Sequence, residues 1–201
     1  MPALETGIFA LMIWGLIGYL FGSIPFGIVI TRVFGLGNLR EIGSGNIGTT
    51  NVLRTGSKPA AAATLLLDGG KGAIAVLIAR LLAGEDAAQV AGLLAFLGHC
   101  FPIWLKFKGG KGVATFLGLM LALAWPVGIA CCLTWLLTAL IGRISSLSAL
   151  VSAASTTFWV VLLGFGQVFL LGIAVTLLVF WRHKENVARL RTGTEPKIGQ
   201  K

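Results

Sequence analysis

The chain has 201 residues, of which 56% are hydrophobic and only 11% are charged, and its mean hydropathy is +0.91. A composition this apolar excludes a soluble globular domain and predicts an integral membrane protein with no nucleic-acid partner. Sixteen Lys and Arg stand against seven Asp and Glu, a net charge of +9, so the basic residues must lie in short segments between apolar runs. At about 20 residues per crossing, the length permits several membrane helices and no separate soluble domain. We therefore expect a single polytopic membrane domain over residues 1–201.

The first apolar run, residues 7–31, is expected to cross the membrane as a helix. It is too long for a secretory signal and lacks the basic region that begins one. The polar segment that follows is rich in basic residues, which the positive-inside tendency places in the cytoplasm. The N-terminus is therefore expected outside. The basic residues of this segment are Arg32, Arg40, Arg54 and Lys58.

The second apolar stretch ends at residues 84–86, an acidic connection that suits an external turn. Arg80, just before it, departs from the charge rule and is expected to extend to the outer interface. Lys106, Lys108 and Lys111 then mark a return to the cytoplasm, and the basic segment from residue 182 onward places the C-terminus there too.

The number of crossings depends on Arg143. If residues 113–142 form two short helices hinged near Pro126, Arg143 lies inside and the total is seven spans. If residues 113–142 and residues 148–181 each form one long helix, Arg143 lies outside and the total is five. Seven is favoured because it places every basic cluster on one side. No strand alternation occurs, so the expected fold is all-α.

The first cytoplasmic loop, about residues 35–58, has the composition of an anion-binding surface. Its glycines let backbone N–H groups approach an oxyanion, its hydroxyls and amides are donors, and Arg54 offers a bidentate fork to phosphate. The loop also fits G-x-G-x-x-G, but a dinucleotide site needs a preceding strand, which is not expected here. The candidate residues are Ser44, Gly45, Asn46, Gly48, Thr50, Asn51 and Arg54.

Two near copies of a Gly-Gly-Lys-Gly turn occur at residues 69–72 and 109–112, each followed by an apolar helix. Neither is a Walker A loop, because Gly rather than Ser or Thr follows the lysine. A turn that opens a helix still sets N–H groups and a positive dipole end beside an ammonium, which suits phosphate. The candidates from these turns are Lys71, Lys108, Gly109, Gly110, Lys111 and Gly112.

Asp68 and Lys71 would lie near mid-membrane in a continuous helix over residues 60–82. Each charge there costs about 2.5 to 3.5 kcal/mol on insertion scales, and two adjacent glycines weaken a helix. The sequence therefore predicts a shallow half-helix over residues 59–67, followed by a Gly69–Gly72 turn that lines a wet cytoplasmic cavity.

Two further cytoplasmic segments carry polar residues. Residues 143–147 bring Arg143, Ser145 and Ser146 to the inner face, and in the tail, residues 183–201, His183 and Asn186 share one helical face. No His, Cys or carboxylate cluster has metal spacing, and no G-x-S-x-G elbow or pair of acid and base carboxylates appears, so a metal hydrolase is not expected. Cys100, Cys131 and Cys132 are expected to be small core residues.

Three ordered segments resemble the signature motifs of a known family over essentially the whole chain. Residues 44–54, residues 98–114 and residues 183–190 are similar to the motifs of the bacterial acyl-phosphate:glycerol-3-phosphate acyltransferases, the PlsY family. The resemblance implies a seven-span inner-membrane enzyme with a cytoplasmic active site. Its reaction moves a fatty acyl group from acyl phosphate to the first hydroxyl of glycerol 3-phosphate, and gives lysophosphatidic acid and phosphate as the first step of phospholipid biosynthesis.

The resemblance also implies no metal and no cofactor, and a donor that another enzyme makes from acyl carrier protein. Ser44, Arg54 and a motif lysine would hold phosphate, His183 and Asn186 would position the acceptor, and Ser145 and Ser146 would add phosphate contacts. The proton acceptor is left open between a substrate phosphate oxygen and His183. From composition alone, a phosphate-ester membrane transporter is the alternative function.

Overall fold

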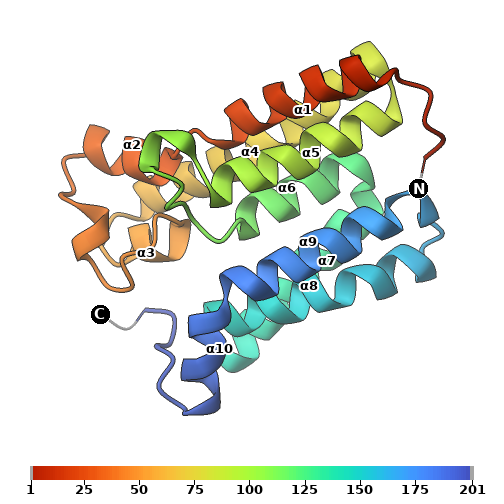
Figure 1. Ribbon diagram of the computed structural model, residues 1–201. Coiled ribbons are helices and arrows are strands. Elements are labelled where there is room, and N and C mark those ends of the chain that lie inside the picture. The colour runs from red at the N-terminus through yellow and green to blue at the C-terminus, as the bar shows by residue number, and fades with distance from the viewer. Residues whose placement is uncertain (1, 200–201) are drawn as a thin grey trace.

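The structure is a computed structural model that describes residues 2–199, and all regular secondary structure in that range is helical. Figure 1 shows the longer helices lying side by side along one axis, with the short helices α2, α3 and α10 at one end and the N-terminus at the other. The α-helices are α1 Ile8–Gly22, α2 Phe26–Val33, α3 Thr49–Leu53, α4 Lys58–Ala83, α5 Glu85–Cys100, α6 Val113–Leu123, α7 Trp125–Gly142, α8 Ser145–Leu162, α9 Phe169–Arg182 and α10 Lys184–Arg191. The 3-10 turns are η1 Leu39–Glu41, η2 Ile103–Leu105 and η3 Gly166–Val168.

Four segments of the described chain are long and apolar enough to cross a membrane, and a fifth joins two helices bent by 63°. The first predicted crossing is broken in the structure, because Pro25 disfavours helical backbone at the residue before it and separates α1 from α2. The four segments are Ile8–Val33, Glu85–Leu105, Trp125–Gly142 and Ser145–Leu162, and the bent pair is Gly166–Arg182 with Lys184–Arg191.

Residues 113–142 form two helices, as the hinge expected near Pro126 requires. Helix α6 ends at Leu123, Ala124 leaves helical geometry, and α7 begins at Trp125 with Pro126 in its first turn. A proline is tolerated there because the first amides of a helix have no intrahelical acceptor. The two helices pack against each other (Figure 1), and the single long helix that five spans required does not occur.

The prediction of a half-helix before a Gly69–Gly72 turn is wrong, because α4 is continuous over 26 residues. Asp68 and Lys71 form an ion pair of 2.8 Å within the helix, and Lys71 also donates to the Ile24 carbonyl. The pair neutralises both charges, so the helix does not need to break to reach water. Gly69 and Gly70 nevertheless line a cavity, as predicted. Gly72 serves packing, because a Cβ on it would lie 2.9 Å from the Thr115 methyl group of α6.

Arg80 does not depend on the outer interface for a partner. Its guanidinium makes an ion pair of 2.7 Å with Glu85, and it donates hydrogen bonds to the carbonyls of Ala122 and Leu123 at the end of α6. The cation therefore satisfies the last carbonyls of a short helix, which a helix C-terminus leaves without intrahelical donors. This arrangement explains a basic residue at the expected external end.

Helices α1 and α5 meet through small residues, and this contact gives a stability prediction. A Cβ on Gly22 would lie 1.9 Å from the backbone oxygen of Ala95. Gly22→Ala should force the helices apart and lower the free energy of unfolding by about 2 kcal/mol. Gly15→Ala is the matched control on the same helix, because its Cβ would meet only side chains, at 3.4 Å. Thermal unfolding in detergent measures both variants, and equal midpoints would contradict the packing argument.

Candidate active site

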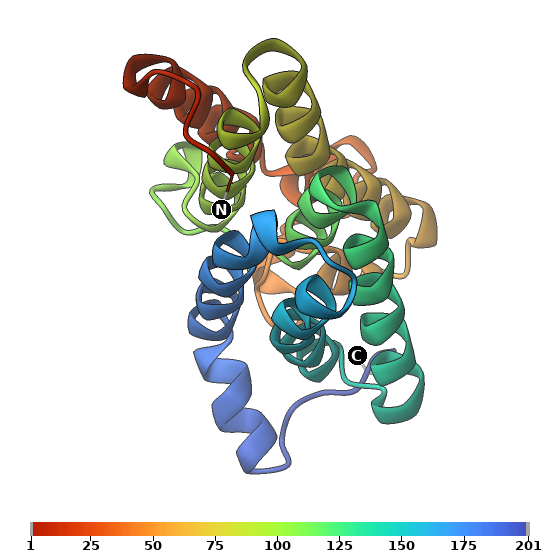
Figure 2. The same cartoon turned by 90° about the vertical axis from the view of Figure 1, so that its right-hand side faces the viewer.

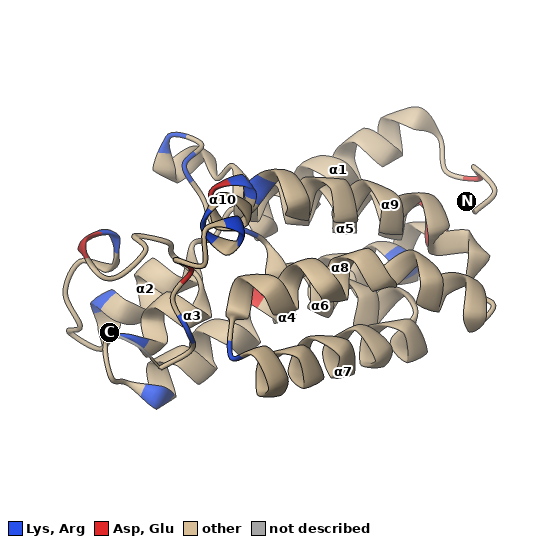
Figure 3. Cartoon of the chain, turned by 90° about the horizontal axis from the view of Figure 1, so that it is seen from below, with Lys and Arg blue, Asp and Glu red and all other residues tan. Residues whose placement is uncertain are grey.

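A cavity of about 1030 Å³ opens among the elements at the basic end of the molecule. Figure 3 shows most Lys and Arg at this end, near α2, α3 and α10. The cavity has a polar part, formed by the loops, and an apolar part between α4, α6 and α7. The apolar part is lined by Leu65, Leu66, Ala73, Val113, Ala114, Leu117, Leu121, Cys132 and Trp135. Cys132 therefore lies on the cavity wall, whereas Cys100 and Cys131 are buried as expected.

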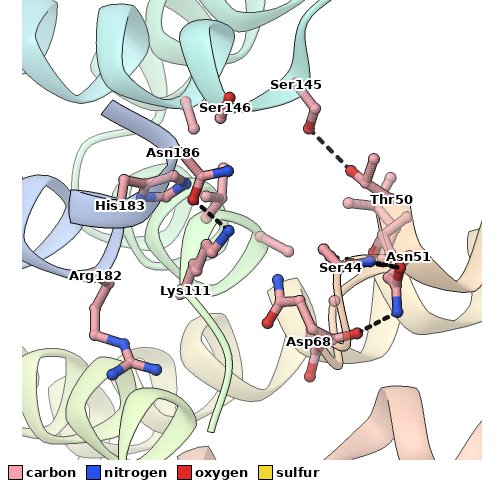
Figure 4. Close-up of a pocket in the computed structure, with 18 of the residues that line it drawn as sticks. Ser44, Thr50, Asn51, Asp68, Lys111, Ser145, Ser146, Arg182, His183 and Asn186 are labelled. Atoms are coloured by element: carbon pink, nitrogen blue, oxygen red, sulfur yellow. Dashed lines mark hydrogen bonds between the residues drawn. The ribbon is translucent and has the colours of Figure 1, made fainter. Parts of the chain in front are cut away.

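Most of the residues predicted from the sequence line the polar part of the cavity, and Figure 4 shows several of them facing one another. Those that line it are Ser44, Gly45, Asn46, Gly48, Thr50, Asn51, Arg54, Lys111, Gly112, Ser145, Ser146, His183 and Asn186. Four predicted residues are not among the lining residues of the described chain: Lys71, Lys108, Gly109 and Gly110. The Lys71 ammonium instead pairs with the Asp68 carboxylate and donates to the Ile24 carbonyl.

Asn51 holds the first loop together. Its Nδ2 donates to the carbonyls of Leu39, Ile42 and Asn46 at 2.8–3.0 Å, and its Oδ1 accepts from the Ser44 amide. The expectation of a freely available amide donor at Asn51 is therefore wrong, because three backbone oxygens of the loop occupy it. A buried side chain that satisfies several loop carbonyls keeps the loop in one conformation.

Arg54 lies over Gly43 with its guanidinium at the cavity. A Cβ on Gly43 would come within 2.5 Å of the Arg54 Nη1 atom, so only glycine allows this approach. Arg54 makes no hydrogen bond or ion pair with the described part of the chain, and its fork is therefore available to an anion. On the same short helix, Thr50 shares a hydrogen bond of 2.9 Å with Ser145, which joins this loop to the start of α8.

The second loop is braced on both sides. The amides of Gly109 and Gly110 donate to the carbonyls of Cys100 and His99 at 3.1 Å, and Arg182 donates to the carbonyls of Gly109 and Gly110. These two amides are already paired, so the expectation that they are open to phosphate does not hold. The bracing instead holds Lys111 at the cavity wall.

A hydrogen-bond network links Lys111 to the C-terminal tail. Lys111 donates to Asn186 Oδ1, and Asn186 Nδ2 donates to Glu195. Glu195 also accepts from Ser146 Oγ at 2.7 Å and pairs with Arg189 at 2.6 Å, and its side chain is only 7% exposed. Figure 2 shows the tail running from α10 back toward the end of α7. Sequence reasoning missed Glu195 because no local pattern indicates that the tail folds over the cavity.

The environment shifts the pKa values of this network. Burial lowers the pKa of Lys111 to about 8, although Glu195 opposes the shift. Burial also lowers the pKa of His183 to about 4, and its Nδ1 lies 2.8 Å from the Val179 carbonyl. Burial would raise the pKa of Glu195, but hydrogen bonds from Ser146, Asn186 and Arg189 outweigh it and lower the value. The site therefore holds a neutral His183 and an ionised Glu195 near neutral pH.

Anion binding at this site should weaken as the pH rises through about 8, because Lys111 then loses its proton. A phosphorylated ligand needs the ammonium form, so its affinity is fully present below this pKa and falls above it. Lys111→Arg should move the loss to higher pH, since a guanidinium stays protonated. Isothermal titration calorimetry with glycerol 3-phosphate between pH 6 and pH 10 measures the affinity of the wild type and of Lys111→Arg. Identical pH dependence would remove Lys111 from anion binding.

Glu195→Ala should release Asn186, Ser146 and Arg189 together, because all three donate to this carboxylate. We expect affinity for a phosphorylated ligand to fall by about tenfold, the effect of one lost charge-assisted hydrogen bond. Glu5→Gln is the control, because the Glu5 amide donates to Asp86 at the start of α5 and neither residue lines the cavity. Calorimetric titration with glycerol 3-phosphate compares the variants, and full affinity in Glu195→Ala would show that the tail does not organise the site.

Comparison with known proteins adds to this geometry. The family model described as "Glycerol-3-phosphate acyltransferase" matches residues 12–193. The chain is 75% identical over 201 residues to a glycerol-3-phosphate acyltransferase of Ruegeria sp. (strain TM1040), covering all of both chains. It is 68% identical to that of Cereibacter sphaeroides (strain ATCC 17025 / ATH 2.4.3), covering all of this chain and 96% of the relative.

Two solved structures are also similar. The crystal structure of PlsY (YgiH), an integral membrane glycerol 3-phosphate acyltransferase, in its glycerol 3-phosphate form is 38% identical with a TM-score of 0.88, over 94% of this chain and 96% of that one. Its lysophosphatidic acid form is 37% identical with a TM-score of 0.87, over 94% and 95%.

Proposed function

The chain belongs to the glycerol-3-phosphate acyltransferase family, and we propose that its cavity transfers a fatty acyl group from acyl phosphate to the first hydroxyl of glycerol 3-phosphate. The products are lysophosphatidic acid and inorganic phosphate. Family membership decides between the two functions that composition left open, in favour of acyl transfer over transport. The observation that carries the proposal is one cavity in which a cationic polar part continues into an apolar part.

Each half of the cavity matches one part of the substrates. The unpaired fork of Arg54 and the ammonium of Lys111 suit phosphate oxygens, with hydroxyls from Ser44, Thr50, Ser145 and Ser146 beside them. His183 and Asn186, near Lys111, are assigned to the acceptor. The acyl chain fits the apolar part between α4, α6 and α7, where it leaves water as it would in the bilayer.

The reaction needs charge stabilisation more than a strong nucleophile. Acyl phosphate carries a good leaving group, and the cations around it stabilise the negative charge that gathers on the departing phosphate. The proposed reaction is metal-independent, because the side-chain cations of the cavity supply this stabilisation. No cofactor is assigned to the cavity.

The family also guides the assignment of membrane topology. We assign seven crossings to α1 with α2, α4, α5, α6, α7, α8 and α9, an external N-terminus, and an active site on the cytoplasmic face of the bacterial inner membrane. The support is the basic end in Figure 3, which also holds the cavity. Glycerol 3-phosphate would reach the site from the cytoplasm, and acyl phosphate would come from an enzyme that uses acyl carrier protein.

Purified protein in a lipid phase tests the proposal. Phosphate release and lysophosphatidic acid formation are expected with palmitoyl phosphate and glycerol 3-phosphate together, and with neither substrate alone. Palmitoyl-CoA and palmitoyl acyl carrier protein serve as control donors and should give no product, while a chelator should leave the rate unchanged. Product from palmitoyl-CoA at a comparable rate would overturn the assignment of the donor.

A further inference from the structure

The polar part of the cavity contains one group whose chemistry is opposite to that of its neighbours. Arg54, Lys111 and the hydroxyls beside them can all donate hydrogen bonds, which suits phosphate. Glu195, from the C-terminal tail, lines the same space and brings a carboxylate into it. An ionised carboxylate only accepts hydrogen bonds, and it repels a phosphate at short distance. The function described so far gives this side chain no contact with a substrate.

Glu195 is fixed by donors from two helices. Its Oε1 accepts from Ser146 Oγ at 2.7 Å and from Asn186 Nδ2, and its Oε2 accepts from Arg189 Nε at 2.6 Å. Ser146 lies at the start of α8, whereas Asn186 and Arg189 lie on α10. Because the donors come from both sides, the carboxylate keeps one position at the cavity wall.

The Glu195 carboxylate has capacity for one more donor. Each oxygen of an ionised carboxylate can accept about two hydrogen bonds. Among the described residues, two donate to Oε1 and one, Arg189, donates to Oε2. Burial acts to raise the pKa of Glu195, but these hydrogen bonds outweigh it and lower the value, which makes the carboxylate a weak base. It can therefore hold a hydroxyl by a hydrogen bond without removing the proton.

Of the two substrates in the proposed function, only glycerol 3-phosphate has hydroxyls that can donate. Ionised acyl phosphate offers a carbonyl oxygen and phosphate oxygens, which are acceptors. Glycerol 3-phosphate has hydroxyls on its first and second carbons. The first hydroxyl attacks the acyl carbon and loses its proton, whereas the second does not react and keeps its proton. The second hydroxyl is therefore the group that matches a carboxylate of low basicity.

The neighbours of Glu195 are residues already assigned to this substrate. Lys111 donates to Asn186 Oδ1, and Asn186 Nδ2 donates to Glu195, so one amide joins the ammonium to the carboxylate. Glycerol 3-phosphate has the complementary groups on adjacent carbons, because its phosphate needs a cation and the hydroxyl on the next carbon needs an acceptor. The order of the three side chains thus fits the order of groups in the ligand.

We propose that Glu195 accepts a hydrogen bond from the second hydroxyl of glycerol 3-phosphate and so determines the specificity of the site for this acceptor. The inference rests on the proposed function and deepens it. With the phosphate held at Lys111 and the second hydroxyl held at Glu195, the first hydroxyl is left free to face the acyl group. Glu195 binds the substrate and takes no proton in the reaction.

An acceptor that lacks the second hydroxyl tests the proposal. The probe is 3-hydroxypropyl phosphate, which keeps the phosphate and the reacting hydroxyl of glycerol 3-phosphate. With palmitoyl phosphate as donor, we expect the wild-type enzyme to have a kcat/KM about 30-fold lower for the probe, within the range for one lost hydrogen bond to a charged group. A kcat/KM for the probe within about threefold of that for glycerol 3-phosphate would overturn the proposal.

Glu195→Gln separates substrate contact from a purely structural role. The amide oxygen of glutamine can still accept from Asn186, so the phosphate contacts should remain. We expect kcat/KM for glycerol 3-phosphate to fall by about tenfold, while the value for 3-hydroxypropyl phosphate changes by less than about threefold. An equal loss for both acceptors would show that Glu195 only organises the site. The matched control is Glu185→Gln, which removes an exposed carboxylate of α10 at the same cavity and should leave the ratio of the two values unchanged.

Calorimetry without an acyl donor covers the case in which Glu195→Gln does not fold. The contact with the second hydroxyl exists before the reaction, so the wild-type protein should bind glycerol 3-phosphate about 30-fold more tightly than 3-hydroxypropyl phosphate. Equal affinities would refute the contact. A wild-type protein that shows this difference in affinity but forms no lysophosphatidic acid with palmitoyl phosphate would instead refute the proposed function.

Discussion

Arg54→Ala should lower kcat/KM for acyl transfer by about 1000-fold, the upper range for the loss of a charged group that binds a developing anion. The reason is that Arg54 has no partner in the described protein that would share its charge, so its whole donor capacity is directed to the ligand. A bidentate fork also fixes the orientation of a phosphate, which a single ammonium does not. Steady-state kinetics with palmitoyl phosphate and glycerol 3-phosphate measure the loss.

Two controls separate charge from fork geometry at this position. Arg54→Lys keeps the charge and should recover only part of the activity, because a lysine cannot make two parallel hydrogen bonds to one phosphate. Arg32→Ala, on α2, removes a basic residue that does not line this cavity and should leave kcat/KM unchanged. If Arg54→Ala loses less than tenfold, the guanidinium does not bind the reacting phosphate.

Gly109→Ala should remove both stability and activity. A Cβ there would lie 2.2 Å from the His99 carbonyl oxygen and 2.6 Å from that of Cys100, and neither backbone atom can yield by a rotamer change. The loop must move away from α5, which breaks its paired amides and displaces Lys111. We expect the free energy of unfolding to fall by about 3 kcal/mol, and kcat/KM to fall by about 100-fold or more, the effect of a displacement of about 1 Å.

Thermal unfolding in detergent and steady-state kinetics, applied to the same preparation, test Gly109→Ala. The control is Gly166→Ala in η3 at the far end, where a Cβ would meet nothing within 4 Å. That variant should keep both the unfolding midpoint and the rate. Wild-type activity in Gly109→Ala would mean that the loop does not need its contact with α5 to place Lys111.

Local sequence patterns predicted the helical membrane fold, the break at Pro126 and most of the cavity lining. These features depend on properties of single residues or of a few neighbouring residues. They are hydropathy, the conformational limits of proline, and the donor chemistry of residues such as Arg54 and Ser145. The pattern failed at α4, where charges and glycines indicated a break. The helix is continuous because Asp68 and Lys71 form an ion pair within it, and because Gly69 and Gly72 lie against α6.

The roles of individual polar residues were predicted less well. The Asn51 amide was predicted to donate to a ligand, but it donates to backbone carbonyls of its own loop. No local sequence pattern indicated Glu195, yet its carboxylate accepts a hydrogen bond from Asn186. The sequence placed His99 in a motif but did not indicate its partner. In the structure it lies beside Asp68, which is 31 residues away in the chain and on another helix. Contacts between positions far apart in the chain leave no repeating pattern in the sequence, so sequence patterns could not predict these pairs.

Composition and motifs predict a helical membrane protein with a surplus of cations in glycine-rich loops, and the motifs indicate its family. Which of the cations is available to a ligand follows from the folded arrangement. Arg54 lies open at the cavity, whereas Lys71 is neutralised by Asp68 inside α4. The physical reason is that charge is a property of one residue, whereas its availability to a ligand depends on neighbours that folding brings from distant parts of the chain.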